Sequence, residues 1–208
     1  MLHTKTVEPN TFSLLKRLLE MPALMNFSLV GGTALSLLYG HRKSIDLDLF
    51  SNKTFDNQEI TQALEGNFKG TFDIRSSHPN FGIFCFVNDI KVDLIRHPHP
   101  LIRPVNHIDG IRMFSTEDII AMKVQAVLGR GTKKDFWDIA ELLNHFPVTD
   151  FVNFHKEKYA TQNLLITVPQ AIAYFADAEG GEDPISLKKQ TWEGVKKSIN
   201  LKVRTYLT

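Results

Sequence analysis

Apolar residues recur at two different spacings in the first half of the chain, and each spacing is typical of one kind of regular structure. Residues 11–20 repeat apolar side chains at helical spacing and stop before Pro22, which predicts a helix there. Other short runs alternate apolar and polar residues or are continuously apolar, as strands are. The predicted strands are 28–30, 45–50, 70–75, 81–87 and 90–95, and the predicted helices between them are 33–39 and 57–68. Asn88-Asp89 separates the last two strands and predicts a hairpin turn.

The pattern changes after the stretch 97–107, which carries Pro and His residues. Ser115 and the acidic residues that follow it are typical of a helix start, and the predicted helix runs to Leu128. After a Gly-Arg-Gly break, a second helix is predicted over 132–145, and the chain from Phe151 onward favours several more helical segments.

These elements predict an α+β fold in two parts. Residues 1–110 are expected to form a domain with a mixed β-sheet flanked by helices, and residues 111–208 an all-helical C-terminal domain. The apolar content of 43% and the charged content of 23% are ordinary for a globular protein. No apolar run is long enough to span a membrane and no secretory signal opens the chain, so no membrane partner is expected. The single Cys85 lies in an apolar run and is expected to be a buried thiol, which together with the lack of a disulfide favours the cytoplasm.

Charge adds one local feature. The formal net charge is only +1, but residues 188–204 hold six Lys and Arg against a single Glu193. A contact with RNA or a partner protein fits this run, and so does a solvated helix face. The tract His97-Pro98-His99-Pro100 is a poor candidate for a metal site, because the prolines keep it extended and no Cys accompanies it.

The most informative chemistry lies between residues 31 and 48. The alternation Ile45-Asp46-Leu47-Asp48 places both carboxylates on one face of a strand. Two like charges side by side are unfavourable without a cation between them, and Mg²⁺ takes oxygen ligands while leaving positions for substrate phosphates. Gly31-Gly32 lies where a short strand meets a helix, a place where backbone N–H groups can bind phosphate oxygens.

A third carboxylate, Asp93, lies on the alternating run 91–95. If its strand is adjacent to the strand of Asp46 and Asp48, the three acids converge. Such a set can hold two Mg²⁺ ions, one activating the attacking oxygen and one neutralising the leaving pyrophosphate. The sequence has neither a GxxxxGK[ST] motif nor a GxGxxG motif, which argues against P-loop and Rossmann folds.

These residues carry a resemblance to a known family. Gly-Gly, a spacer, Asp-x-Asp and a later Asp resemble the DNA polymerase β-type nucleotidyltransferase superfamily. More narrowly, GGTALSLLYGHRKSIDLDLF followed by MKVQAVLGRGTKKDFWDIAELL is similar to the AbiEii/AbiGii toxin family of nucleotidyltransferases. The resemblance covers residues 25–145, and residues 146–208 match no motif. The family usually has Arg where this chain has Lys134, which keeps the charge but loses the bidentate geometry.

The resemblance implies a nucleotidyltransferase-type sheet and roles for individual residues. Lys123 would reach the nucleotide phosphates as a point charge. Asp138 would act as general base on an acceptor hydroxyl or would orient Lys123, unless it only forms an intrahelical ion pair with Lys134. The expected catalytic residues are Asp46, Asp48, Asp93, Lys123 and Asp138, the first three also as metal ligands. The expected nucleotide-binding residues are Gly31, Gly32, Thr33, Arg42, Lys43, Lys123 and Lys134.

Some of these residues have a second interpretation. Arg42 and Lys43 either steady the triphosphate or lie in a solvated loop, and Thr33 either binds phosphate or caps the helix. The implied reaction transfers a nucleoside monophosphate from a nucleoside triphosphate (NTP) to an acceptor hydroxyl, which in relatives can be a tRNA 3′ end. The implied setting is the toxin half of a bacterial toxin–antitoxin or abortive-infection system, with a cognate antitoxin. Two alternatives stay open: a small-molecule (antibiotic-type) nucleotidyltransferase, and a non-catalytic binding protein on the same fold.

Overall fold

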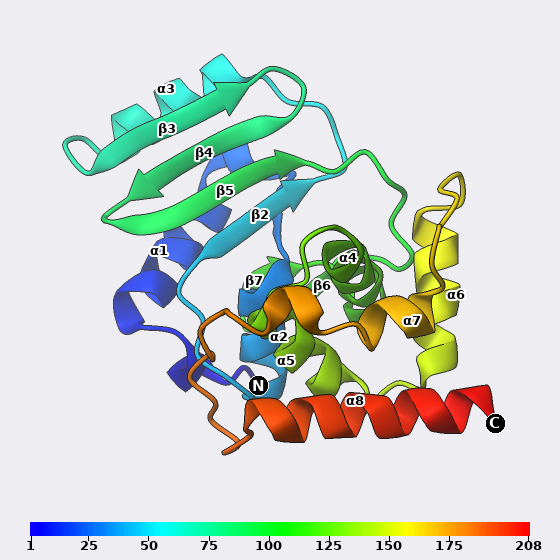
Figure 1. Ribbon diagram of the computed structural model, residues 1–208. Coiled ribbons are helices and arrows are strands. Elements are labelled where there is room, and N and C mark those ends of the chain that lie inside the picture. The colour runs from blue at the N-terminus through cyan, green and yellow to red at the C-terminus, as the bar shows by residue number, and fades with distance from the viewer.

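A computed structural model describes residues 1–208 and shows a seven-stranded mixed sheet with helices on both sides (Figure 1). The order across the sheet is β3-β4-β5-β2-β1-β7-β6. The strands are β1 (Ser28–Leu29), β2 (Leu47–Ser51), β3 (Phe72–His78), β4 (Gly82–Val87), β5 (Ile90–Arg96), β6 (Asn106–Ile108) and β7 (Ile111–Met113). The expected α+β class is thus confirmed.

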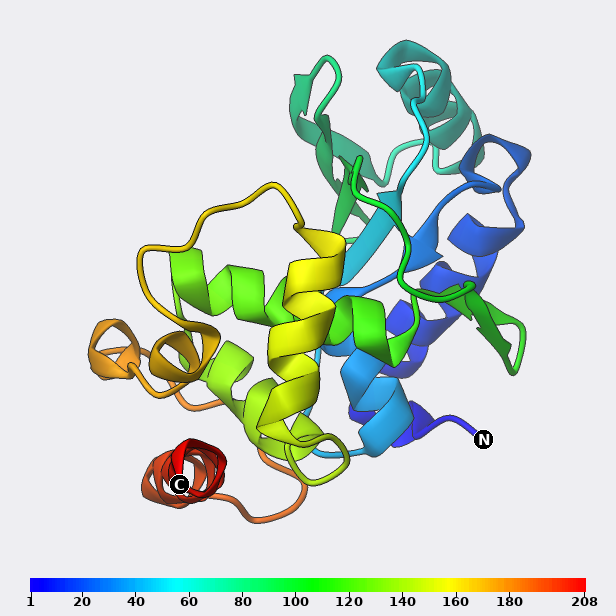
Figure 2. The ribbon, with the colours of Figure 1, turned by 90° about the vertical axis from the view of Figure 1, so that its right-hand side faces the viewer.

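The helices lie in two groups separated by the sheet. They are α1 (Pro9–Glu20), α2 (Gly31–Tyr39), α3 (Asn57–Asn67), α4 (Thr116–Gly129), α5 (Lys133–Leu142), α6 (Val148–Lys158), α7 (Val168–Ile172) and α8 (Trp192–Leu207). Figure 2 shows α1 and α3 on one side of the sheet and α4 through α8 on the other, and α2 packs against α4 and α5 of the second group. None of these helices combines the length and the apolar character needed to cross a membrane.

The pairing of the central strands β2, β4 and β5 determines which side chains lie next to each other in the site. β2 and β5 run parallel, although their residues are far apart in the chain, and Asp48 pairs directly with Asp93. β4 is antiparallel to β5 and places Phe84 beside Asp93. Paired residues on neighbouring strands point to the same face, so the two carboxylates project side by side.

One hydrophobic core joins the sheet to the helices. A single cluster of 45 buried residues runs from Leu2 to Val203 and contains residues of both halves of the chain. The boundary expected near residue 110 falls at the turn between β6 and β7, so the sheet continues to Met113. The hairpin of β6 and β7 was absent from the predicted strands because each strand is only three residues long. Its Asp109-Gly110 turn, with both φ angles positive, was the available signal.

The segment before α8 crosses back to the loop that follows α2. Arg42 and Ser186 form an antiparallel β-bridge. The Lys43 N–H donates to the Ile185 carbonyl and the Leu187 N–H donates to the His41 carbonyl, each at 2.9 Å. These two hydrogen bonds, which make up the bridge, clamp the loop 41–43 between α2 and the C-terminal part of the chain.

Candidate active site

Asp48 and Asp93 form a carboxylate pair on the sheet face that looks towards α4. Lys91 binds one oxygen of Asp93 at 2.8 Å, while the other oxygen, Oδ1, is buried without a hydrogen-bond partner. Burial, and next the charge of Asp93, raise the pKa of Asp48. The pair therefore has the two properties expected of cation ligands: close like charges and an oxygen with no partner in the protein.

The first turn of α2 packs against Asp48 and explains the glycine at its start. Gly31 has a φ of +70°, in the left-handed region that favours glycine. A Cβ atom on Gly31 would lie 2.5 Å from Asp48 Oδ2. The carboxylate therefore occupies the space that a side chain would need, beside the electropositive end of the helix.

We expect Gly31→Ala to destabilise the fold by more than about 1 kcal/mol, because alanine is strained at positive φ and collides with Asp48. Nucleotide affinity should fall as well, since Asp48 must move. Urea unfolding and calorimetry with a non-hydrolysable NTP would measure both effects. Gly66→Ala is the matched control: this helical glycine has open space around it, so the change should stabilise the fold by about 0.5–1 kcal/mol. Equal stability changes in the two variants would contradict the role assigned to Gly31.

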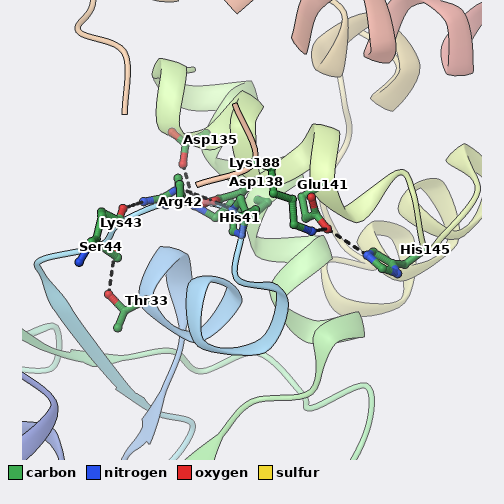
Figure 3. Close-up of polar contacts among 11 residues, drawn as sticks. Thr33, His41, Arg42, Lys43, Ser44, Asp135, Asp138, Glu141, His145 and Lys188 are labelled. Atoms are coloured by element: carbon green, nitrogen blue, oxygen red, sulfur yellow. Dashed lines mark hydrogen bonds and ion pairs between the residues drawn. The ribbon is translucent and has the colours of Figure 1, made fainter. Parts of the chain in front are cut away.

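Behind α2 lies a buried ion network centred on Asp138 of α5 (Figure 3). Arg42 donates to both carboxylate oxygens, Nε to Oδ1 at 2.7 Å and Nη2 to Oδ2 at 2.9 Å. His41 Nε2 lies 2.7 Å from Oδ1 and Lys123 Nζ lies 2.7 Å from Oδ2. Lys123 also binds Asp135 at 2.9 Å. A Cβ on Gly32 would overlap the Arg42 guanidinium, so this glycine makes room for the network.

The network determines the protonation of its members. Burial alone would raise the pKa of Asp138, but Lys123 and Arg42, with the hydrogen bonds from His41 and Arg42, hold it well below its usual range. For Lys123, burial opposes the charge, but the nearby Asp138 and Asp135 outweigh it and raise the pKa. Both residues are therefore charged at neutral pH, and Lys123 is held in place by two carboxylates.

The two groups of residues meet in a cavity of about 400 Å³ between the sheet and α4. The sheet contributes Asp48 and Asp93, and α4 contributes Lys123 opposite them. Arg130 and Asp135 line the cavity where α4 ends and α5 begins. The cavity thus combines a carboxylate pair, a helix start and a buried cation, with walls from both halves of the chain.

Comparison with known proteins identifies the family to which this chain belongs. The family model described as nucleotidyl transferase AbiEii toxin, type IV toxin–antitoxin system, matches residues 13–203. The chain belongs to the AbiEii family of nucleotidyltransferase toxins. The resemblance drawn from the motifs is confirmed, as are the enzyme class of a nucleotidyltransferase and the setting of a toxin–antitoxin system. Membership of this family implies an NTP substrate and an antitoxin partner.

Chains similar to this AbiEii protein are found in several bacteria. An uncharacterized protein of Aquifex aeolicus strain VF5 is 30% identical over 200 residues, which cover 93% of this chain and 94% of that protein. The structure of JHP933 from Helicobacter pylori has a TM-score of 0.58 at 20% identity and covers 99% of this chain and 93% of its own. The nucleotidyltransferase toxin MenT4 from Mycobacterium tuberculosis has a TM-score of 0.59 at 12% identity, with 94% and 84% covered. At these identities the two structures establish likeness of fold.

Asp46, the third predicted metal ligand of the AbiEii chain, does not line the cavity that Asp48 and Asp93 line. It precedes the first residue of β2, and its carboxylate lies 3.6 Å from the ammonium of Lys134. The Thr33 hydroxyl donates to the Asp46 carbonyl oxygen and so fixes its backbone. No group of three His, Cys, Asp or Glu side chains is gathered closely enough to hold a metal ion. The three-carboxylate set therefore stays a prediction, with two members in register.

Four of the predicted assignments receive a different place in the structure. Asp138 is fully buried with both oxygens occupied, so it has the geometry to orient Lys123 and not that of a general base. Arg42 binds Asp138 and does not line the cavity, so its contact with the triphosphate stays a prediction. Thr33 is buried against Asp46 and neither caps α2 nor faces the cavity. Gly32 accommodates Arg42, as described above.

Lys43 and Lys134 lie outside the cavity. Lys43 is 3.5 Å from Glu8, and Lys134 is 57% exposed and reaches Asp46 rather than Asp138. The basic run 188–204 is partly neutralised within the chain. Lys188 binds Glu141 at 2.7 Å and Lys196 binds Glu179 at 2.8 Å.

Three residues of the site, Asp135, His97 and Tyr159, are not among the site residues predicted from the sequence. Asp135 anchors Lys123 and accepts from the Thr132 hydroxyl, a capping box whose T-x-x-D spacing was a readable signal. His97 and Tyr159 line the far end of the cavity. Tyr159 lies in the part of the chain without a motif, so no local signal was available for it.

Proposed function

We propose that this protein transfers a nucleoside monophosphate from an NTP to a hydroxyl group of an RNA acceptor, in a magnesium-dependent reaction. One observation carries the proposal: Asp48 and Asp93 project side by side into a cavity that also presents the start of α2 and the cation of Lys123. This arrangement places groups for cation binding and groups for phosphate binding on facing walls.

The residues present fit a hard divalent cation. Asp48 carries a raised pKa in the protein alone, and Asp93 Oδ1 is a buried oxygen without a partner. Both are oxygen donors of the kind Mg²⁺ takes. Asp48 and Asp93 would hold the ion, with Asp46 as the third carboxylate nearby in the chain. Bound Mg²⁺ would supply charge neutralisation on the triphosphate and on the leaving pyrophosphate.

Side chains of this protein would bind the phosphates and keep them in place during the reaction. Lys123, kept charged and oriented by Asp135 and Asp138, attracts the phosphates. The acceptor oxygen forms a bond to the α-phosphorus while the bond to the β-phosphate oxygen breaks, and pyrophosphate leaves. The proton of the acceptor hydroxyl passes to solvent water, because Asp93 Oδ1 would be taken by the ion and Lys91 binds the other Asp93 oxygen.

Exposed cations favour RNA over a small-molecule acceptor. Lys91 is 45% exposed, Lys134 is 57% exposed and Arg130 is 73% exposed. Each is within 4 Å of an acidic residue in or beside the cavity: Lys91 of Asp93, Lys134 of Asp46 and Arg130 of Asp135. Exposed cations at the rim of the cavity can contact the phosphates of a polyanionic chain, and they have no comparable value for a small neutral acceptor.

Incubation with each α-labelled NTP, Mg²⁺ and either total RNA or a panel of hydroxylated small molecules tests the proposal. We expect label on RNA, abolished by EDTA and by Asp93→Asn, and weakened by high salt because rim contacts are ionic. Label only on small molecules would favour the antibiotic-type reaction. Absence of label on every acceptor, with NTP still bound, would favour the non-catalytic binding protein.

A further inference from the structure

Beyond the carboxylates, the cavity changes from charged to apolar along both of its walls. On the sheet side, Asp93, Ile95 and His97 occupy alternate positions along and just past β5 and all line the cavity. Four residues of extended chain cover roughly 13 Å. On the opposite wall, Ile119 and Met122 precede Lys123 along α4.

The two apolar stretches lie at the same end of the cavity. The His97 ring is 6.5 Å from the ring of Phe114, which lies just before the start of α4. Tyr159, at the end of α6, closes this end with its ring 6.1 Å from His97. The charged end and the apolar end are thus separated by the four residues of extended chain between Asp93 and His97.

His97 carries an unused polar atom at the apolar end. Its Nε2 is buried and has no hydrogen-bond partner in the protein. Burial, and next the charge of Lys158, lower the pKa of His97 to about 3. The imidazole is therefore neutral at physiological pH, with one nitrogen as donor and the other as acceptor. A buried polar atom of this kind gains from a ligand that supplies the missing partner.

Gln125 offers a second polar group beside it. Gln125 lines the cavity, and its side-chain oxygen lies 3.0 Å from His155 Nε2, which leaves the amide nitrogen available as a donor. Lys158 fixes the surrounding loop, because its ammonium binds Asp118 at 2.6 Å and the Pro100 carbonyl at 2.9 Å. The apolar end is thus a rigid recess with aromatic sides and two hydrogen-bonding groups.

A nucleobase has the matching chemistry: flat apolar faces that stack on aromatic rings and an edge of donors and acceptors. We propose that the recess formed by His97, Gln125 and Tyr159 holds the base of the NTP, and that His97 selects the base through a hydrogen bond from or to Nε2. This inference rests on the proposed function, because it takes the phosphates to lie at the carboxylate end.

The test compares base preference with phosphate affinity. Calorimetry would measure the affinities of non-hydrolysable analogues of the four NTPs, and of tripolyphosphate, with Mg²⁺. We expect the wild-type protein to prefer some bases over others. His97→Phe keeps an aromatic ring and removes both nitrogens, so the preferred NTP should bind about tenfold more weakly. Tripolyphosphate affinity should stay unchanged.

Two further variants serve as controls for the effect of His97→Phe. His99→Ala is the matched control, because His99 also packs on Tyr159, with ring centroids 4.6 Å apart, but does not line the cavity. It should keep the wild-type preference. His97→Gln retains a donor and an acceptor, so it should recover affinity or shift the preferred base, and thermal melting would verify that each variant is folded.

The possible outcomes distinguish a failure of this inference from a failure of the proposed nucleotidyl transfer. A base preference that is absent in the wild type or unchanged in His97→Phe would overturn the inference and leave nucleotidyl transfer standing. An equal loss of affinity for tripolyphosphate would also overturn it, since His97 would then act on the whole site. A wild-type protein that binds neither NTP nor tripolyphosphate would overturn the proposed function itself.

Discussion

Asp138→Asn is expected to lower the free energy of unfolding by about 3–5 kcal/mol, because it leaves Arg42 and Lys123 charged and buried without their main counter-charge. The side chains of these two cations are only 4% and 9% exposed, so water cannot replace the lost carboxylate. Urea unfolding at neutral pH would measure the loss. Nucleotidyl transfer should fall as well, since Lys123 loses one of its two anchors.

The pH dependence of this effect has a defined sign. The pKa of Asp138 is held below its value in the unfolded chain, so its stabilisation is fully present above the unfolded pKa. It is lost as the pH falls through the folded-state pKa, and the gap between wild type and variant should narrow only in acid. Asp177→Asn, at an exposed position, is the control and should change stability by less than about 0.5 kcal/mol. A fully stable but inactive Asp138→Asn would instead support a general base.

Asp48→Asn is expected to reduce transfer by a factor on the order of 10³ and, at the same time, to stabilise the metal-free protein. The loss of rate follows from the loss of cation-mediated charge stabilisation in the transition state. The gain in stability follows from the raised pKa of Asp48: the folded protein holds that proton more tightly than the unfolded chain, so the carboxylate charge opposes folding at neutral pH. Each kcal/mol of relief should raise Tm by about 2–4 °C.

Mg²⁺ provides the discriminating measurement for this variant. Thermal melting of the wild type should shift upward on addition of Mg²⁺, while the melting of Asp48→Asn should respond weakly. Asp73→Asn removes an exposed acid of the same sheet, which pairs only with Arg75, and should alter neither rate nor melting. A lower Tm for metal-free Asp48→Asn would show that the carboxylate stabilises the fold.

The strands that carry Asp48 and Asp93 could be predicted from the sequence because the alternation of apolar and polar residues is visible within a few positions. The alternation around Asp48 and around Asp93 defines two strand faces, and the hairpin at Asn88-Asp89, where both φ angles are positive, follows from the turn residues. The parallel pairing that puts the two acids in register could only be stated as a condition. It depends on packing of the whole sheet, which no short pattern encodes.

The roles of Arg42 and Asp138 required the structure. They are 96 residues apart in the chain and meet only because the loop after α2 packs against α5. In the sequence, an Arg before a metal-binding strand and an Asp at helical spacing from a Lys fit phosphate binding and acid–base chemistry equally well. Burial decides between these interpretations. Arg42 and Asp138 are both buried, and a buried charge must be paired, so each is the partner of the other.

The clamp on residues 41–43 has a consequence for how the protein is made. During synthesis the ribosome releases the loop and its Arg42 long before residues 185–187, which supply both backbone hydrogen bonds between the loop and the C-terminal segment. When β2 with Asp48 has left the ribosome, the residues that fix the loop before this strand have not yet been made. For a protein from a toxin family, this order leaves the loop and its Arg42 unclamped until translation has passed residue 187, and a premature stop before that point leaves the loop permanently unclamped.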